Sequence, residues 1–346
     1  MRRLHFKLYF QSLIEFVFHL FCVGLLICYP IYSKTKEIQK QEIWIDTIEP
    51  GTELIMVTDE GNIDINSWDL DSIRIEITKH GWGRTERKAN QVLDNIYIDI
   101  QDNEHRLIVR ERYTGKDDFN VLDLLEPKNW QGISGGHKRV DYKIIMPCKM
   151  NYKLKHDEGD VSIENLKGSF SISMNEGRCQ LKNISYNDCR IEIDEGEIVL
   201  NRLIGENNSE LHLYCDEGWI QGDSLTGDQA IFEVDDGHVR LEDIKYNILD
   251  CLVDEGNILA ALHLVPQGRY DLSSSEGDIK IQLLNDVPIR VMLYSEGGRI
   301  DTNLDLKIRR SNESEKVRDI LGKSAETFLK VLAEEGDIQL YQNLKN

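Results

Sequence analysis

The sequence predicts an all-β fold, a parallel β-solenoid with about 20 residues and two short strands per coil, preceded by one transmembrane helix. An acidic pair followed by glycine returns at a regular interval along most of the chain. Apolar residues alternate on both sides of each glycine, and one long apolar run stands near the N-terminus. Hydrophobic residues make up 40% of the chain, which is enough to bury a continuous core.

The apolar run is "LIEFVFHLFCVGLLICYPIY", residues 13–32, long enough to cross about 30 Å of hydrocarbon as a helix. No small-x-small cleavage site follows it, and large residues precede Cys28, so we expect a retained anchor and not a cleaved signal peptide. Residues 1–32 are then a cytoplasmic tail and transmembrane helix, 33–48 a linker, and 49–346 the solenoid. Positive charges flank the run on both sides; we expect the bulk of the chain to be extracytoplasmic.

The repeat is written as "DEGDVSI" at 157, "DEGEIVL" at 194 and "DEGNILA" at 254. Between Gly159 and Gly277 its glycines are spaced 18 to 22 residues apart, which is a solenoid period. We assign these glycines to the repeat: Gly61, Gly159, Gly177, Gly196, Gly218, Gly237, Gly256, Gly277, Gly298 and Gly336.

Apolar residues stand two and four places after the glycines, as in Val161 and Ile163, and seven, five and three places before them, as in Phe170, Ile172 and Met174. Alternation of this kind is typical of strands. One coil cannot bury its own apolar face, whereas stacked coils form a continuous core. Each coil is therefore predicted to hold two short strands and two corners.

The C-terminal copies are less regular. Taking Gly298 as the repeat position implies a one-residue bulge at Gly297, and Gly336 follows 38 residues later, which we interpret as two periods. Asn312 and Glu315 have the spacing of a helix capping box, so a short helical insertion is expected over residues 309–327.

The period is also lost between Gly61 and Gly159, with an aperiodic insertion at 79–140. Here "SIRIEIT" predicts a strand, residues 85–96 a short helix, "IYIDIQ" and "RLIVRER" a hairpin, and residues 140–148 a strand that returns to the array. We expect this segment to form a cap that covers the first edge of the solenoid.

The strand that ends at Pro147 and the glycine repeats that begin at Gly159, in "VDYKIIMPCKMNYKLKHDEGDVSIENLKGSFSISMNEG", resemble the putative-adhesin family, a domain of unknown function. The resemblance covers about residues 45–346. It implies a bacterial β-solenoid at the cell surface or in the periplasm, often carried behind one membrane span, with no established enzymatic activity. Ser, Thr or Asn is more usual in the family's turns than the acidic residues found here.

The acidic pair has two interpretations. Asp two places before a glycine is turn chemistry, because glycine reaches positive φ without strain and Asp caps the turn with its side chain. A row of carboxylates is also a weak Ca²⁺ or Mg²⁺ surface, although no calcium-binding motif is present. The candidate ligands are Asp157, Glu158, Glu176, Asp194, Glu195, Asp216, Glu217, Asp254 and Glu255. An acidic docking face is the third alternative.

A basic, tryptophan-bearing group falls in the aperiodic segment of this otherwise acidic chain. Its residues are Trp82, Arg84, Arg87, Lys88, Trp130, Lys138 and Arg139. They are either solvated loops with a tryptophan folded down, or a contact for anionic headgroups or a cell-wall polymer close to the membrane.

The formal net charge of −20 argues against nucleic acid as a partner. No catalytic motif is present and the nine histidines share no register, so we expect no cofactor and no catalysis. A polysaccharide-acting β-helix enzyme stays as an alternative, although coils this short leave little room for a substrate groove. The seven cysteines form no CxxC motif, and we expect those outside the span to be small buried side chains.

Overall fold

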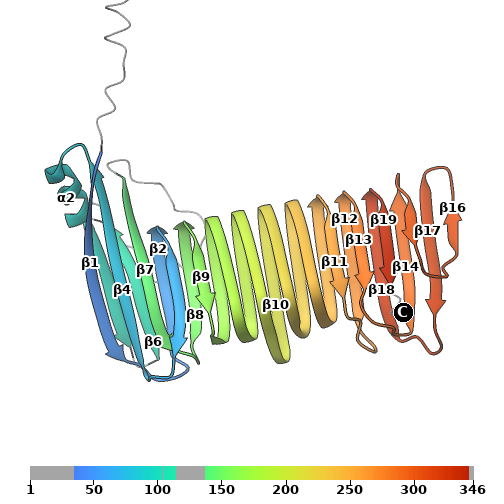
Figure 1. Cartoon of the computed structure of the whole chain (residues 1–346), viewed down its shortest axis with the longest axis horizontal. Coiled ribbons are helices and arrows are strands. Elements are labelled where there is room, and N and C mark those ends of the chain that lie inside the picture. The colour runs from blue at the N-terminus through green and yellow to red at the C-terminus, as the bar shows by residue number, and fades with distance from the viewer. Residues whose placement is uncertain (1–34, 104, 114–136, 343–346) are drawn as a thin grey trace, which may run out of the picture.

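The computed structural model describes residues 35–103, 105–113 and 137–342, which form one elongated stack of strands (Figure 1). The transmembrane helix predicted at 13–32 lies outside these residues. Within the part that the structure describes, no helix has the length and apolar character needed to cross a bilayer.

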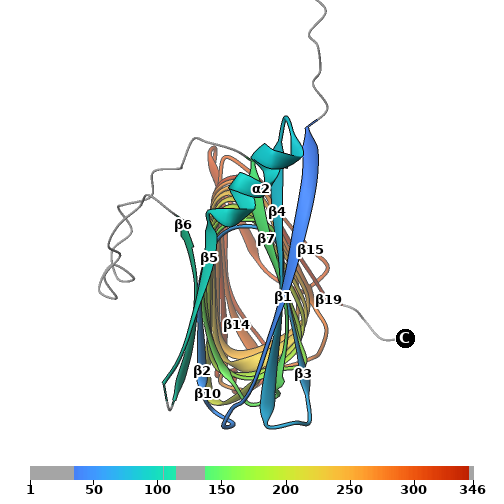
Figure 2. The same ribbon diagram turned by 90° about the vertical axis from the view of Figure 1, so that its left-hand side faces the viewer.

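Two walls of strands face each other across the stack (Figure 2). The first wall contains, among others, β2 (Glu53–Glu60), β8 (Asn151–Glu158), β12 (Arg269–Glu276), β18 (Thr327–Glu335) and β14 (Ile289–Glu296). The second contains β3 (Ile63–Trp68), β9 (Val161–Glu164), β11 (Ile258–Leu262), β13 (Ile279–Leu283), β19 (Ile338–Gln342) and β15 (Ile300–Thr302). The long β10 (Lys167–Glu255) contributes successive coils to both walls. It pairs with β8 and β9 at one end and with β11 and β12 at the other.

Strands of neighbouring coils pair in parallel and in the register of the repeat. Glu158 lies opposite Glu60 on one side and Glu176 on the other, and Glu276 lies opposite Glu255. Matching letters of the repeat are therefore neighbours in space. The all-β prediction and the parallel stacking of the repeats are confirmed.

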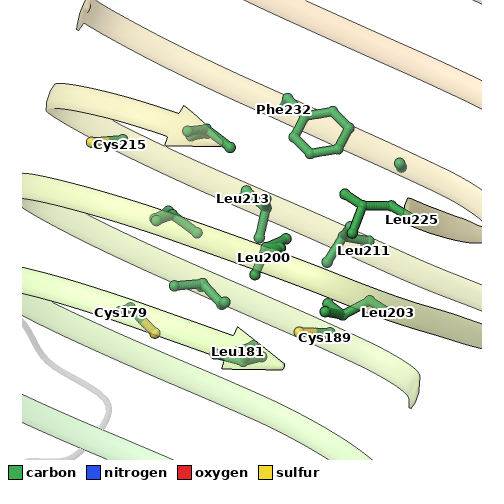
Figure 3. Close-up of a cluster of buried hydrophobic side chains, with 14 of the residues drawn as sticks. Cys179, Leu181, Cys189, Leu200, Leu203, Leu211, Leu213, Cys215, Leu225 and Phe232 are labelled. Carbon is green, nitrogen blue, oxygen red and sulfur yellow. The ribbon is translucent and has the colours of Figure 1, made fainter. Parts of the chain in front are cut away.

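The alternating apolar residues point between the walls and form one cluster that runs from Ile48 to Leu340. Figure 3 shows part of it, with leucines of successive coils packed beside Phe232. Cys179, Cys189, Cys215 and Cys251 belong to this core as free, buried thiols, as expected. Cys148 differs from the expectation, since it is exposed at the end of a strand.

The segment between Gly61 and Gly159 builds the N-terminal end of the stack. It contains β4 (Ser72–Gly83), α2 (Glu86–Asp94), β5 (Ile96–Asn103), β6 (Arg106–Tyr113) and β7 (Lys138–Pro147). The Thr85 side chain accepts a hydrogen bond from the Lys88 N–H and caps α2, and β5 and β6 pair antiparallel. The predicted helix, hairpin and return strand are confirmed.

The predicted linker at 33–48 was wrong for most of its length. It contains β1 (Lys36–Thr47), which pairs antiparallel with β4 along 12 residues. Ile38 and Trp44 are partly buried and pack against the core, whereas Ile43 and Ile45 on either side of Trp44 are exposed. This segment therefore has an apolar face to bury. β4 is the one strand partner of β1 among the described residues, so the outer edge of β1 has no strand beside it there.

The helical insertion predicted at 309–327 was also wrong. Its place is taken by β16 (Ile308–Arg310) and β17 (Ser314–Leu321), an antiparallel hairpin in which β17 also pairs with β14. The Glu315 carboxylate receives the Ile300 N–H at 2.8 Å and pairs with Arg310 at 2.8 Å instead of capping a helix at Asn312. These contacts with the neighbouring strands β15 and β16 override the helix-capping pattern of the segment.

The order of the last coils differs from the order in the sequence. β18 pairs with β12 on one side and with β14 on the other, and β19 pairs with β13 and β15. Gly336 therefore lies between Gly277 and Gly298, and not two periods beyond Gly298. Spacing alone could not reveal this order, because every coil shares the same register.

Candidate functional site

The glycines of the repeat stand in one column at one corner of the stack. Gly237, with φ of +151°, would place a Cβ atom 1.6 Å from the carbonyl oxygen of Gly218. From Gly159 to Gly336 along the column, the corresponding distances to the neighbouring glycine oxygen are 1.6 to 2.2 Å. No side chain fits at such a distance, so the close approach requires glycine along the column, and from Gly159 to Gly277 the positive φ requires it as well.

The aspartates two places before the glycines form hydrogen bonds from coil to coil. Asn175 Nδ2 donates to Asp157 Oδ1 at 2.5 Å, and Ser275 Oγ donates to Asp254 Oδ1 at 2.8 Å. Asp59 pairs with Lys138. These bonds join side chains of neighbouring coils, and they differ from the predicted capping of the aspartate's own turn.

A second row of acceptors stands directly after the glycines and was missed in the sequence. Asn257 Oδ1 accepts the Asp278 N–H at 2.8 Å, Asp278 Oδ1 accepts the Asp337 N–H at 2.8 Å, and Asp337 Oδ1 accepts the Arg299 N–H at 2.7 Å. The N-terminal end repeats this with Asn62 and Asp160. The recurrence of Asn or Asp immediately after the glycine was the available signal.

Three of the glutamates immediately before the glycines join adjacent coils through their backbone carbonyl groups. The carbonyl oxygens of Glu158, Glu176 and Glu335 accept the N–H of a glycine in the adjacent coil, at 2.9 to 3.1 Å. The carboxylates of Glu158, Glu176, Glu195, Glu217 and Glu255 belong to exposed residues. They form an acidic edge that runs along the corner.

The described part of the chain brings no three His, Cys, Asp or Glu side chains into an arrangement that could hold a metal ion. The candidate ligands lie in coils one above another, as expected, and each coil supplies at most two of them. The carboxylates therefore form a line along the stack and do not surround a common centre where a metal ion could bind.

Burial, with a smaller effect of neighbouring carboxylates, raises the pKa of several acidic groups on this edge. Burial and the neighbouring Asp59 raise the pKa of Asp157 to about 6. Burial raises the pKa of Asp194, with Asp216 adding to the effect, and burial also raises the pKa of Glu60. Protonation at mildly acidic pH thus lowers the repulsion along the edge.

The opposite side of the second wall carries another column, six places after the glycines, in the left-handed conformation. Asn165, Asn183, Arg202, Ser224 and Asp243 have φ between 54° and 61°. Asn183 Nδ2 donates to Asn165 Oδ1, and Asn165 Nδ2 donates to Asn66 Oδ1, both at 3.0 Å. Asn tolerates this conformation best after glycine, which explains the asparagines.

At the N-terminal end the structure separates the predicted basic group into two parts. Trp82 stacks on His80, with ring centroids 5.7 Å apart, and lies 5.3 Å from the ring of His137. Lys138 pairs with Asp59, and Arg139 Nε donates to Asp141 Oδ1 at 2.7 Å. These charges are neutralised by acidic neighbours, and the tryptophan is folded down.

Arg84, Arg87 and Lys88, which we call the basic shoulder, are exposed and form no ion pair among the described residues. Lys36 Nζ contacts Glu86 Oε1 at 2.8 Å, so the shoulder lies beside the start of β1. Figure 2 shows α2 above the end of the stack next to β1. Trp130 lies outside the described residues.

A polar cluster inside the cap was not foreseen. Tyr113 Oη and the Asp59 N–H donate to Glu111 Oε2 at 2.7 and 3.1 Å, while Lys138 Nζ lies 3.0 Å from the centre of the Tyr113 ring. Glu111 Oε1 is buried without a hydrogen-bond partner in the described structure. Desolvation raises the pKa of Glu111 to about 7.

His156, another buried polar residue, faces the core beside the glycine column. Its Nδ1 lies 2.8 Å from Thr58 Oγ1, and burial lowers its pKa to about 4. The ring is therefore neutral in the folded protein at neutral pH.

Comparison with known proteins gives a family and a set of similar structures. The model of the toastrack domain DUF4097 matches residues 62–341. A putative adhesin from Bacteroides fragilis is 10% identical, with a TM-score of 0.39 over 87% of this chain and 97% of the other. A putative adhesin from Parabacteroides merdae is 14% identical, with a TM-score of 0.39 over 87% and 96%.

A further solved structure, a putative lipid binding protein from Parabacteroides distasonis, is 12% identical, with a TM-score of 0.42 over 87% of this chain and 96% of the other. The comparison with curated proteins gave no match. The family model covers the glycine repeats, the cap beyond Gly61 and the inserted last coil. The chain therefore belongs to the toastrack family, DUF4097.

Proposed function

We propose that this protein is a membrane-anchored, extracytoplasmic β-solenoid that acts as an adhesin-like binding surface or spacer and not as a catalyst. The observation that carries this proposal is the single core from Ile48 to Leu340, which joins all the coils into one rod. A rod of stacked coils repeats the same outward positions at a spacing of about 4.8 Å. Such rows suit many weak contacts made together.

Two features favour binding over catalysis. The carboxylates of the acidic edge stand in file along one corner, and no three His, Cys, Asp or Glu side chains of the described residues converge as metal ligands would. Two of the hollows among the described residues hold about 300 and 320 Å³, and both lie at corners of the coils. Such hollows are small for a polysaccharide that must be held on several sugars, so the β-helix enzyme is the weaker alternative.

The basic shoulder supports a place close to the membrane. The chain between Tyr32, the last residue of the predicted span, and Lys36 can extend no more than about 14 Å. Arg84, Arg87 and Lys88 are then within reach of the headgroup region, where each basic residue near an anionic surface contributes about 1 kcal/mol. We expect them to hold the cap against anionic lipid.

The side of the membrane is tested by adding protease to intact cells. The proposal expects cleavage of the solenoid without lysis, and protection of the solenoid would contradict it. Purified cell-wall polymer would then be used for pull-down and for turnover assays. Retention without cleavage supports a binding surface, whereas release of sugar fragments would establish the enzyme.

Contact with lipid is tested by hydrogen exchange on the full chain in nanodiscs. Amides of α2 should exchange several-fold more slowly in anionic than in zwitterionic discs, and about 0.5 M salt should remove the difference. The variant R84S/R87S/K88S should lose it. The matched control R309S/R318S/K323S removes the same charge at the far end and should keep it; equal exchange in both lipids would refute the contact.

Weak divalent binding on the acidic edge is the remaining alternative. The expected affinity is about millimolar, as in other extracellular calcium modules. A titration of the protein with Ca²⁺ at low salt that gives neither heat nor a higher melting temperature would leave turn chemistry alone to explain these residues.

A further inference from the structure

We propose that the last strand pair of the chain, β18 and β19, is an exchangeable insert, and that a second copy of this protein accepts it in the same slot. The slot is the space between the coil of Gly277 and the coil of Gly298. This proposal concerns how two copies associate, and it does not depend on the proposed function.

The insert occupies a position that its place in the sequence does not predict. β12 and β13 form one side of the slot and β14 and β15 the other, and both sides precede the insert in the chain. Figure 1 shows β18 and β19 seated before β14, with β16 and β17 at the end of the stack. The two sides must therefore separate for the insert to enter.

The two sides of the slot are complementary to each other as well as to the insert. Arg299 N–H donates to Asp337 Oδ1 at 2.7 Å, and Asp337 N–H donates to Asp278 Oδ1 at 2.8 Å. Without the insert, the same Arg299 N–H meets the chemically identical acceptor on Asp278. The row of hydrogen bonds along the glycine corner then closes without a gap.

The buried serines of the slot also indicate that its two sides can bond each other directly. Ser274 Oγ donates to the carbonyl oxygen of Gly256, and Ser295 Oγ donates to that of Gly336, both at 2.9 Å. Each serine thus bonds the glycine of the coil below it. If the insert leaves, Ser295 can bond Gly277 in the same manner, so the coil of Gly298 can rest directly on the coil of Gly277.

The connection across the slot has room for this movement. Residues 284–288 step over the level that the insert occupies, and a hollow of about 300 Å³ lies beside them, lined by Asn285, Pro288, Leu321, Gly322 and Gln342 among others. Gln342 Nε2 donates a hydrogen bond to the Asn285 carbonyl oxygen at 3.2 Å and so joins the insert to this connection.

The hinge of the insert is residues 322–326, between β17 and β18. Of these five residues, only Ala325 is buried. The hinge is held by Arg290 Nε to the Ala325 carbonyl oxygen at 2.8 Å, and by Gln267 Nε2 to Glu326 Oε2 at 2.7 Å. Short hinges of this kind permit exchange of an identical element between copies.

We infer that the partner is a second copy of this chain, because the released insert can bury its apolar residues again only in a slot of the same shape and register. Its inward residues Leu329, Val331, Ala333, Ile338 and Leu340 are all 0% exposed in the structure. Exposure of this row to water is unfavourable, at roughly 25 cal/mol for each Å² of apolar surface. Only a slot with the same register buries all five again, and another copy offers that slot.

The test uses two full-length chains with different tags, each with Cys22, Cys28 and Cys148 replaced by serine. One carries Ser273→Cys and the other Leu332→Cys, because Ser273 and Leu332 are direct partners in β12 and β18. The chains are unfolded in urea, refolded together and oxidised gently. The proposal expects a disulfide-linked heterodimer, because an insert from one copy brings its cysteine beside that of the other.

The matched control pairs Leu332→Cys with Ser173→Cys, which occupies the same outward position in a coil far from the slot. The 273–332 heterodimer should exceed the 173–332 heterodimer by about tenfold or more, and Arg269→Cys with Phe328→Cys should repeat the result at a second pair of partners. Equal yields for slot and control pairs at both positions would overturn the proposal.

Discussion

Glycine at the acidic corner is required for two separate reasons, and substitutions can tell them apart. Gly237 combines φ of +151° with a carbonyl oxygen only 1.6 Å from the position of an added Cβ. Gly51 has φ of +90° but no atom within 4 Å of that position. The first glycine has both a strained conformation and a clash to avoid, and the second has only the conformation.

Gly237→Ala should therefore lower the free energy of unfolding by more than about 3 kcal/mol, because the neighbouring coil must move. Gly51→Ala should lower it by about 1 kcal/mol. Urea unfolding followed by circular dichroism measures both. Similar losses in the two variants would mean that the coils do not approach each other this closely.

Glu111 gives a prediction about pH. Its pKa is raised from 4.5 to about 7, so the folded state holds the proton more strongly than the unfolded chain. The fold is then favoured by protonation at low pH, and this contribution is lost as the pH rises from 4.5 through 7. Glu111→Gln keeps an acceptor for Tyr113 and carries no charge, so it should be more stable than the parent by roughly 1–2 kcal/mol at pH 8 and no more stable at pH 4.5.

Urea unfolding at the two pH values checks this prediction. The pKa of His156 is lowered to about 4, so its stabilising contribution is lost as the pH falls from 6.5, but parent and variant share that loss and the difference isolates Glu111. Glu111→Leu removes the acceptor for Tyr113 and for the Asp59 N–H and should be destabilised at both pH values. An unchanged pH dependence in Glu111→Gln would show that the carboxyl group is solvated.

For the glycine corner as a structural element, substitutions in the row of acceptors after the glycines can show whether the hydrogen bond or the negative charge stabilises it. Asp278→Ala should lower the free energy of unfolding by about 1 kcal/mol, because the Asp337 N–H loses its acceptor. Asp278→Asn keeps an oxygen at that place and should remain within about 0.5 kcal/mol of the parent. Thermal unfolding of the two variants decides this: equal losses would assign the role to the negative charge.

Local pattern predicted most elements of this protein because local and tertiary preferences agree there. The strands follow from alternation around the glycines, and α2 follows from the cap at Thr85. The pattern failed at Glu315, whose side chain bonds Ile300 and Arg310 in other strands. It failed again at β1, where the sequence predicts a linker although Ile38 and Trp44 pack against the core.

Coil order could not be predicted for a different reason. The coils of Gly277, Gly298 and Gly336 have interchangeable acceptors, such as Asp278 and Asp337. Any order of these coils satisfies the same register, and the choice is made by the loops that join them. In the candidate site the glycine column was therefore predictable, while the neutralisation of Lys138 and Arg139 required the fold of the cap.

For the whole molecule, the acidic edge predicts a dependence of stability on salt. Carboxylates in adjacent coils stand about 4.8 Å apart, and each neighbouring pair repels by up to about 1 kcal/mol at low salt. Changing Glu176, Glu195, Glu217 and Glu255 to glutamine should raise the melting temperature by several degrees in 10 mM salt. The gain should shrink in about 0.5 M NaCl, where such charges are screened.

The control for this prediction removes four exposed carboxylates that are not stacked, with Glu49, Asp102, Asp305 and Glu313 changed to the corresponding amides. Calorimetry at both salt concentrations compares the two variants. If the scattered changes raise the melting temperature as much as the stacked ones, net charge and not the row would be responsible.

The central claim is that repeats adjacent in register are adjacent in space, one coil on the next. It is tested most directly by measuring the distance between two spin labels with pulsed electron paramagnetic resonance. The labels are attached to cysteines introduced at Ser173 and Ser273, in a chain whose Cys22, Cys28 and Cys148 are replaced by serine. These positions share one row and lie five coils apart, so their backbones should be separated by about 24 Å. A narrow distribution of label distances near that value is predicted, and a broad distribution or one centred far from it would contradict the stacked-coil structure.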